Sequence, residues 1–158
     1  MRDQRPGNEE GTKVRWCVVA NQSKARIYRQ TSKDFNPMLI QEVLHPKGRL
    51  QNREIDSDAP GRSFQSWSGT EKRHALSTEE STHQHESKKF AAEIDELLKK
   101  GRVEHSFDEL ILMAEPRFLG MMLSELDQPT KRLLVEQVQK DIVQMTDHQI
   151  IQNIKEIH

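Results

Sequence analysis

Alternation of apolar and polar residues predicts three β-strands near the N-terminus. The stretch 13–20 alternates and then becomes wholly apolar, 25–29 alternates again, and 38–44 supplies a third run. Turn-forming residues at 21–24 and 34–37 separate the three stretches. Because the first turn is short, the first two strands are expected to form a hairpin, which the third strand continues as a meander.

From Ser81 onward the apolar residues recur with the period of a helix. Ser81 and Gln84 have capping-box spacing, and apolar residues between Phe90 and Leu98 fall on one face before Gly101 ends the pattern. A helix is therefore expected from about residue 81 to Gly101. The elements expected after it are a buried strand over 107–114, a short helix from Pro116 to Leu126, a strand over 134–142 and a final helix capped by Thr146.

The order of these elements (βββ, long loop, α, β, α, β, α) predicts an α/β fold with a single mixed β-sheet and flanking helices. Residues 13–158 are expected to form one domain, and residues 1–12, which are polar and show no periodicity, a disordered tail. The long loop covers residues 45–82. A loop of this length is unusual in a compact domain and is as a rule either functional or disordered. It is therefore the first candidate for a contact element.

The composition indicates a modest core and a large solvated surface. Of the 158 residues, 34% are hydrophobic and 31% are charged, and the formal net charge of −1 gives no overall attraction to nucleic acid or anionic membranes. No apolar run approaches the roughly 20 residues that span a bilayer. The N-terminus lacks the apolar segment of a secretory signal. We therefore expect no membrane span and a cytoplasmic location.

Few residues have the spacing of a metal or catalytic site. Cys17 is the single cysteine, and its apolar neighbours predict a buried structural thiol. His83 and His85 lie two residues apart, which on a helix points them to different sides. Asp56 and Asp58 could share a divalent cation in an extended segment, although acidic residues beside a Pro-Gly pair more often form turns. No metal, cofactor or catalytic residue is therefore assigned.

Two features are candidate contacts for an anion or for RNA. A helix start at Pro116 leaves backbone N–H groups that could hold an anion with help from Arg117; the alternative is that Pro116 only starts the helix while Gly120 permits close packing. In the long loop, basic residues interleaved with aromatic ones could pair with phosphates and stack on bases, and the alternative is an ordinary solvated loop. These loop residues are Arg49, Arg53 and Arg62, beside Phe64 and Trp67.

Several stretches together resemble the bacterial host-attachment protein family. They are the opening strand and hairpin over 16–27, the loop motif Asp58-Ala59-Pro60-Gly61-Arg62, the helix sequence His85-Glu86-Ser87-Lys88-Lys89-Phe90-Ala91, the strand-turn-helix over 107–120, and Lys140-Asp141 before a capped helix. The resemblance covers most of the chain after residue 13. It implies a protein that acts through contact with a protein partner or the host-cell surface, directly or as an indirect effect on adhesion.

The order of elements is also similar to the middle domain of eukaryotic and archaeal peptide-release factors and Pelota-like proteins, which has a ribonuclease H-like fold. This likeness implies a connection to the ribosome. The Gly-Gly-Gln tip of the release factors is absent, since the loop has Pro60-Gly61-Arg62-Ser63-Phe64-Gln65 instead. The first strand ends in Asn21, an amide where a nuclease of that fold would have a metal-binding carboxylate. Neither peptidyl-tRNA hydrolysis nor nuclease activity is therefore expected.

Three hypotheses follow. The first is a non-enzymatic binding protein of the host-attachment family with the loop 45–82 as its contact element. The second is a translation-associated factor that touches ribosomal RNA through the arginines of the loop and through Arg117. The third is a metal-dependent hydrolase that uses Asp56, Asp58 and His85. The candidate binding residues are Arg49, Arg53, Asp58, Gly61, Arg62, His85, Arg117 and Gly120.

Overall fold

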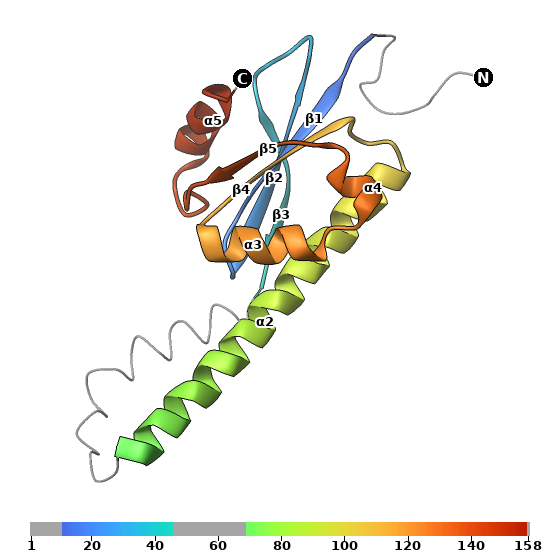
Figure 1. Ribbon diagram of the computed structural model, residues 1–158. Helices are drawn as coiled ribbons and strands as arrows, with labels where there is room; N and C mark the ends of the chain where they lie inside the picture. The colour runs from blue at the N-terminus through green and yellow to red at the C-terminus, as the bar shows by residue number, and fades with distance from the viewer. Residues whose placement is uncertain (1–10, 46–68, 158) are drawn as a thin grey trace.

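The computed structural model describes residues 11–45 and 69–157, with side chains over 11–45 and 82–157. The elements in these ranges are β1 (Val14–Ala20), β2 (Lys24–Thr31), β3 (Met38–Leu44), α2 (Gly69–Val103), β4 (Glu109–Ala114), α3 (Pro116–Glu125), α4 (Gln128–Lys131), β5 (Leu134–Gln139) and α5 (Asp147–Lys155). The five strands form one sheet, and the helices pack against it (Figure 1). The predicted α/β fold with a single mixed sheet and flanking helices is confirmed.

The sheet has the strand order β3-β2-β1-β4-β5. β1, β2 and β3 form the predicted antiparallel meander, whereas β4 pairs parallel to β1 and β5 pairs parallel to β4. Asn21 closes the first hairpin, because its Oδ1 accepts hydrogen bonds from the backbone N–H groups of Ser23 and Lys24, both at 2.9 Å. β1 therefore lies in the middle of the sheet with a partner on each side.

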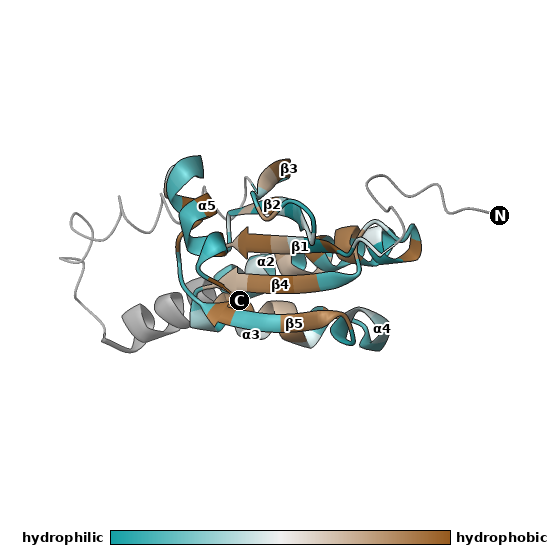
Figure 2. Ribbon diagram, turned by 90° about the horizontal axis from the view of Figure 1, so that it is seen from above, coloured by the Kyte–Doolittle hydropathy of each residue, from teal (hydrophilic) through white to brown (hydrophobic). Residues whose placement is uncertain are grey.

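Two cores lie on opposite faces of the sheet. On one face, side chains of α2 and α3 pack against Trp16, Val18 and their neighbours; on the other, α5 packs against Cys17 and Val19. Successive residues of β1 point to opposite faces, so the part of the strand that is covered on both sides, Trp16–Ala20, is apolar, and the arrowhead half of β1 is hydrophobic in Figure 2. The predicted burial of Cys17 is confirmed, and burial raises the pKa of its thiol to about 12.

The helix expected from residue 81 begins twelve residues earlier, at Gly69. The stretch 70–80 lacks an apolar stripe, but it also lacks Gly and Pro and is rich in Glu, Lys, Arg and Ala, which have high helix propensity. Helix propagation needs no apolar face once a docked segment has nucleated it. The predicted loop 45–82 is therefore too long, and the proposed cap at Ser81 is wrong.

The same helix continues past Gly101 to Val103. His105 then adopts a left-handed conformation with φ of 57°, and the N–H of Ser106 returns to the carbonyl of Gly101 at 2.7 Å. Gly101 is needed for packing instead. A Cβ there would lie 2.8 Å from the ring of Trp16 and 3.1 Å from that of Phe107.

Two further boundaries differ from the prediction. β5 ends at Gln139 instead of 142, because Ile142 and Val143 turn into the core beneath α5. A short helix, α4, forms where only a break was expected, since the side chain of Asp127 accepts a hydrogen bond from the N–H of Thr130 at 3.0 Å and caps it. The capping box predicted at Thr146 is confirmed. Of the predicted tail, residues 1–10 lie outside the described ranges.

An acidic contact lies where α2 meets α4. The pKa of Asp95 is raised from 3.8 to about 6, mainly by burial and also by the carboxylates of Asp127, Glu96 and Glu125. The ionised form of Asp127, in contrast, is favoured, because its hydrogen bonds to Thr130 lower its pKa and Arg102 lies 3.4 Å away. At neutral pH the ionised form of Asp95 therefore destabilises the folded state.

Substitution of two helical glycines by alanine is expected to have opposite effects. Gly101→Ala places a methyl group against the Trp16 ring, and overpacking of this kind costs about 1–3 kcal/mol, which exceeds the roughly 1 kcal/mol gained in helix propensity. Gly120→Ala meets nothing within 4 Å and is expected to stabilise the protein by about 0.5–1 kcal/mol. Urea denaturation measures both changes; a Gly101→Ala variant as stable as Gly120→Ala would contradict the close approach.

Asp95→Asn is expected to raise the melting temperature at neutral pH. Between the pKa of about 4 in the unfolded chain and the pKa of about 6 in the folded state, Asp95 keeps its proton only when the protein is folded. The contribution of this group to stability therefore falls as pH rises from about 4 to about 6. Asn removes this dependence while it keeps an oxygen acceptor. Thermal melts at about pH 7 and about pH 5 should show a larger gain at the higher pH. A gain that is equal at both values would contradict the raised pKa.

Candidate interaction site

β3 is an edge strand that carries exposed apolar side chains. Within the described ranges it pairs with β2 alone, and six of its seven residues are exposed. Eight large hydrophobic side chains are exposed in the described part of the chain, and five of them fall between residues 35 and 44. They are Phe35 (67% exposed), Met38 (65%), Leu39 (39%), Ile40 (41%) and Leu44 (48%). We call these five residues the β3 patch.

The β3 patch reaches both faces of the sheet. Leu39 lies opposite Tyr28, whose side chain belongs to the core beneath α5, whereas Met38 lies opposite Arg29, which in turn lies opposite Trp16 of the core of α2 and α3. The register shifts between Ile27 and Tyr28, so Ile40 is an extra residue in a bulge. Because successive residues of a strand point to opposite faces, the consecutive Met38, Leu39 and Ile40 cannot all lie on one face of the sheet, and the bulge further displaces Ile40 from the regular alternation.

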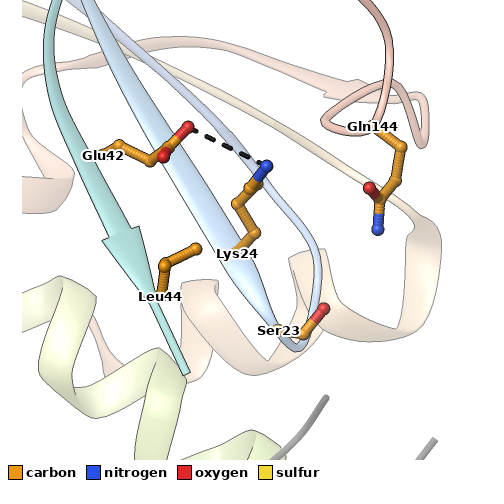
Figure 3. Close-up of a pocket in the computed structure, with 5 residues that line it drawn as sticks. All are labelled: Ser23, Lys24, Glu42, Leu44 and Gln144. Carbon is orange, nitrogen blue, oxygen red and sulfur yellow. Dashed lines mark ion pairs between the residues drawn. The ribbon is translucent and has the colours of Figure 1, made fainter. Parts of the chain in front are cut away.

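A polar pocket of about 270 Å³ adjoins the C-terminal half of β3 (Figure 3). Its lining consists of Ser23, Lys24, Glu42, Leu44 and Gln144. Oε2 of Glu42 lies 2.9 Å from Nε of Arg26 and 3.9 Å from Nζ of Lys24, so two cations of β2 neutralise the one ionisable side chain of β3. Arg26 also donates to the backbone oxygen of Met145 at 3.2 Å, which ties the loop before α5 to this edge.

His45 fixes the end of β3 to α2. Its backbone N–H donates to the carbonyl of Ser23 at 2.8 Å, and its ring stacks on Phe90 with centroids 4.9 Å apart. Nε2 of His45 lies 3.4 Å from Oε2 of Glu86, and both side chains are buried. A second contact joins α2 to the turn after β1, because the hydroxyl of Ser87 donates a hydrogen bond to Oε1 of Gln22 at 3.2 Å. β3 is therefore held in place by contacts to α2 and β2, although no described residue pairs with its outer edge.

α3 offers less to an anion than its sequence suggested. The carboxylate of Glu115 accepts hydrogen bonds from the N–H groups of Arg117 at 3.2 Å and Phe118 at 2.6 Å, and so satisfies two of the groups expected to hold the anion. Arg117 itself is exposed. Gly120 is exposed too, and a Cβ there would meet nothing within 4 Å, so the close packing expected at Gly120 is also wrong.

Of the remaining predicted site residues, the structure describes His85 alone. His85 is exposed on α2, beside the buried Glu86. The loop residues Arg49, Arg53, Asp58, Gly61 and Arg62, and Asp56 with them, lie outside the described ranges. Within residues 11–45 and 82–157, no three His, Cys, Asp or Glu side chains gather in a way that could hold a metal ion. In the same ranges no helix has the length and apolar character needed to cross a membrane.

The β3 patch was missed, although the sequence carried a signal for it. Met38-Leu39-Ile40 is a run of three apolar residues in a strand that ends a meander and is followed by a long polar stretch. Such runs in a strand with a free edge are exposed unless a further element covers them, and exposure of this kind is typical of a binding surface. The pair of His45 and Glu86 could not be found this way, because the two residues are far apart in the sequence.

The sequence profile of one protein family, described as "Protein required for attachment to host cells", matches residues 16–154. The chain belongs to this family. The match to the host-attachment family begins in β1 and ends in α5, so it includes every strand, the β3 patch and His45. No curated protein is significantly similar to the chain. The likeness to ribonuclease H-like and release-factor domains stays a prediction.

Glu86→Ala is expected to destabilise the protein, because it leaves the buried ring of His45 without its polar partner. A buried polar group that loses its partner costs about 1–3 kcal/mol. His85→Ala is the matched control, since His85 is the preceding residue of the same helix and is exposed, and surface changes stay within about 0.5 kcal/mol. Chemical denaturation of the two variants measures the difference. Equal stability would show that the His45–Glu86 contact does not fix β3 to α2.

Proposed function

We propose that this host-attachment family member is a non-enzymatic binding protein that contacts a protein partner or a surface through the edge of β3. The observation that supports the proposal most directly is the β3 patch. Five large apolar side chains crowd one strand and the residues before it, while the exposed hydrophobics elsewhere in the described ranges are single residues on other elements. Large exposed apolar areas with polar rims are typical of interaction sites.

The two edges of the sheet differ in a way that supports this assignment. On β5, the opposite edge, Glu136, Gln137 and Gln139 are exposed, and polar or charged side chains of this kind are the usual protection against unwanted strand pairing. β3 has less of that protection, because its exposed polar side chains are Gln41 and Glu42 alone and Glu42 is neutralised by Arg26. An apolar edge would be an aggregation hazard in a protein that had no use for it.

An edge strand also suits recognition through the backbone. The outer N–H and C=O groups of β3 are directed away from β2 and can form a ladder with a further strand, while the β3 patch supplies the apolar contacts. Rigid placement favours binding, because less conformational entropy is lost than when a loop must be ordered. The anchor of His45 on α2 gives β3 this rigidity.

The other two hypotheses rest on residues that provide less support. Ribosomal RNA binding was based on Arg49, Arg53 and Arg62, which lie outside the described ranges, and on the helix start at Arg117, where Glu115 already caps the chain. The hydrolase hypothesis was based on Asp56 and Asp58, which also lie outside the described ranges, and on His85, which is exposed on α2. No feature of residues 11–45 or 82–157 favours either. A cytoplasmic location also stays a prediction; it would make the effect on attachment indirect.

The double variant Leu39→Lys/Ile40→Lys is expected to reduce attachment of the bacteria to host cells by about tenfold or more, since each 1.4 kcal/mol of lost binding is a factor of ten. Two ammonium groups on the β3 edge would have to be desolvated in any apolar contact. Val135→Lys on the β5 edge is the control, because Val135 is exposed to a similar degree as Leu44. Attachment is counted in cells that produce equal amounts of each protein.

Normal attachment by the β3 double variant would reject the β3 edge as the contact. Protease treatment of intact cells adds the location. Cleavage of the protein indicates direct contact with the host surface, whereas full protection leaves an indirect role within the bacterium. In both cases the β3 variant, and not the Val135→Lys control, should lose the effect.

A further inference from the structure

We infer that the partner of the β3 edge is a second copy of this chain, with the two β3 strands paired antiparallel across a two-fold axis. The inference rests on the proposed function in one respect, namely that β3 is a contact edge. It goes further by naming what binds there. The two five-stranded sheets would become one continuous sheet with β3 at its centre.

The distribution of the β3 patch over both faces favours a partner that has layers on both faces. Leu39 faces the α5 side, and Met38 faces the side of α2 and α3. A single extended peptide would add one strand and leave much of this surface in water. A second copy brings its own β3 patch together with the helices that flank its sheet, so apolar area is removed from water on both faces.

Backbone geometry is self-complementary in this arrangement. In an antiparallel pair the two strands exchange N–H and C=O groups reciprocally, so two identical edges can satisfy one another around a two-fold axis. A parallel pairing of two copies would not give this symmetry. The strand is seven residues long, which is above the usual length of a strand and sufficient for a ladder.

Charge does not oppose the pairing. A two-fold axis through the middle of β3 brings two Glu42 side chains toward each other, and two bare carboxylates there would repel. Each Glu42 is already paired with Arg26 at 2.9 Å and lies 3.9 Å from Lys24 on its own sheet. Both cations belong to β2, and Figure 3 shows Lys24 beside Glu42.

The available area matches a dimer of modest affinity. From the exposed fractions, the five side chains of the β3 patch present on the order of 500 Å² per copy, so two copies bury about 1,000 Å², near the lower limit of specific interfaces. An interface of this size with an apolar centre predicts a dissociation constant in the micromolar range, on the order of 1–100 µM. The dimer is therefore expected to depend on concentration.

Sedimentation velocity of the full chain tests the inference. Over a concentration series from about 1 µM to about 100 µM, the mass should rise from the 18.4 kDa of one chain toward twice that value. Leu39→Lys/Ile40→Lys should remain a monomer at every concentration, with a dissociation constant raised at least tenfold. Val135→Lys should dimerise as the wild type does. A wild-type protein that stays monomeric throughout overturns the inference, and so does dimerisation that the Val135→Lys change abolishes.

Cross-linking gives a second measurement that does not depend on a destabilising variant. Gln41→Cys introduces an exposed thiol in the middle of β3, and Gln137→Cys does so on β5; the native Cys17 is buried and contributes little background. A bis-maleimide linker should join Gln41→Cys into dimers at least ten times more efficiently than Gln137→Cys. Equal efficiency at the two positions would show that the copies meet elsewhere.

The two proposals can fail separately. If the wild type is a monomer but the β3 double variant still loses attachment, β3 remains the contact and the second copy is rejected as its partner. Another protein, or residues 46–68 of the same chain, would then occupy the edge. A dimer that the β3 double variant abolishes while attachment stays normal confirms the inference and rejects β3 as the attachment contact.

Discussion

The parallel pairing of β1 with β4 is the interaction on which the rest of the structure depends. Both strands have a neighbour on each side and are covered on both faces, so their side chains feed two cores at once. This double burial gives each strand about twice the apolar contact of an edge strand, and it supports α2 and α3 on one face and α5 on the other. Outer strands lie under no such constraint, and it is there that the surface is available for binding.

The sequence predicted the fold well wherever burial alone shapes the pattern. The apolar run 16–20 marked a central strand, and the spacing of Thr146 and Gln149 marked the cap of α5. The errors arose where the deciding force left no periodic signal. The start of α2 follows from propensity without an apolar face, and Gly101 is explained by the ring of Trp16, a residue 85 positions earlier.

The candidate site was harder to predict, for a related reason. Arg117 and His85 were predicted as site residues because residues of these types often bind ligands or take part in catalysis. The backbone N–H of Arg117 is already hydrogen-bonded to Glu115, however, and His85 is an exposed neighbour of Glu86, the residue that contacts His45. What distinguishes the β3 edge is that none of the residues described in the structure covers it. Whether an apolar strand lies at the centre of a sheet or at its edge depends on strand order, and a single sequence does not specify that order before the pairing of β4 with β1 is known.

The unequal edges of the sheet also limit how far self-association can proceed. If β3 pairs with the β3 of a second copy, neither copy has an unpaired β3 edge left, so assembly closes at two chains. If β5 were as apolar as β3, head-to-tail addition could continue without end and produce a fibre. In the proposed dimer the exposed glutamate and glutamines of β5 would therefore end assembly at two chains.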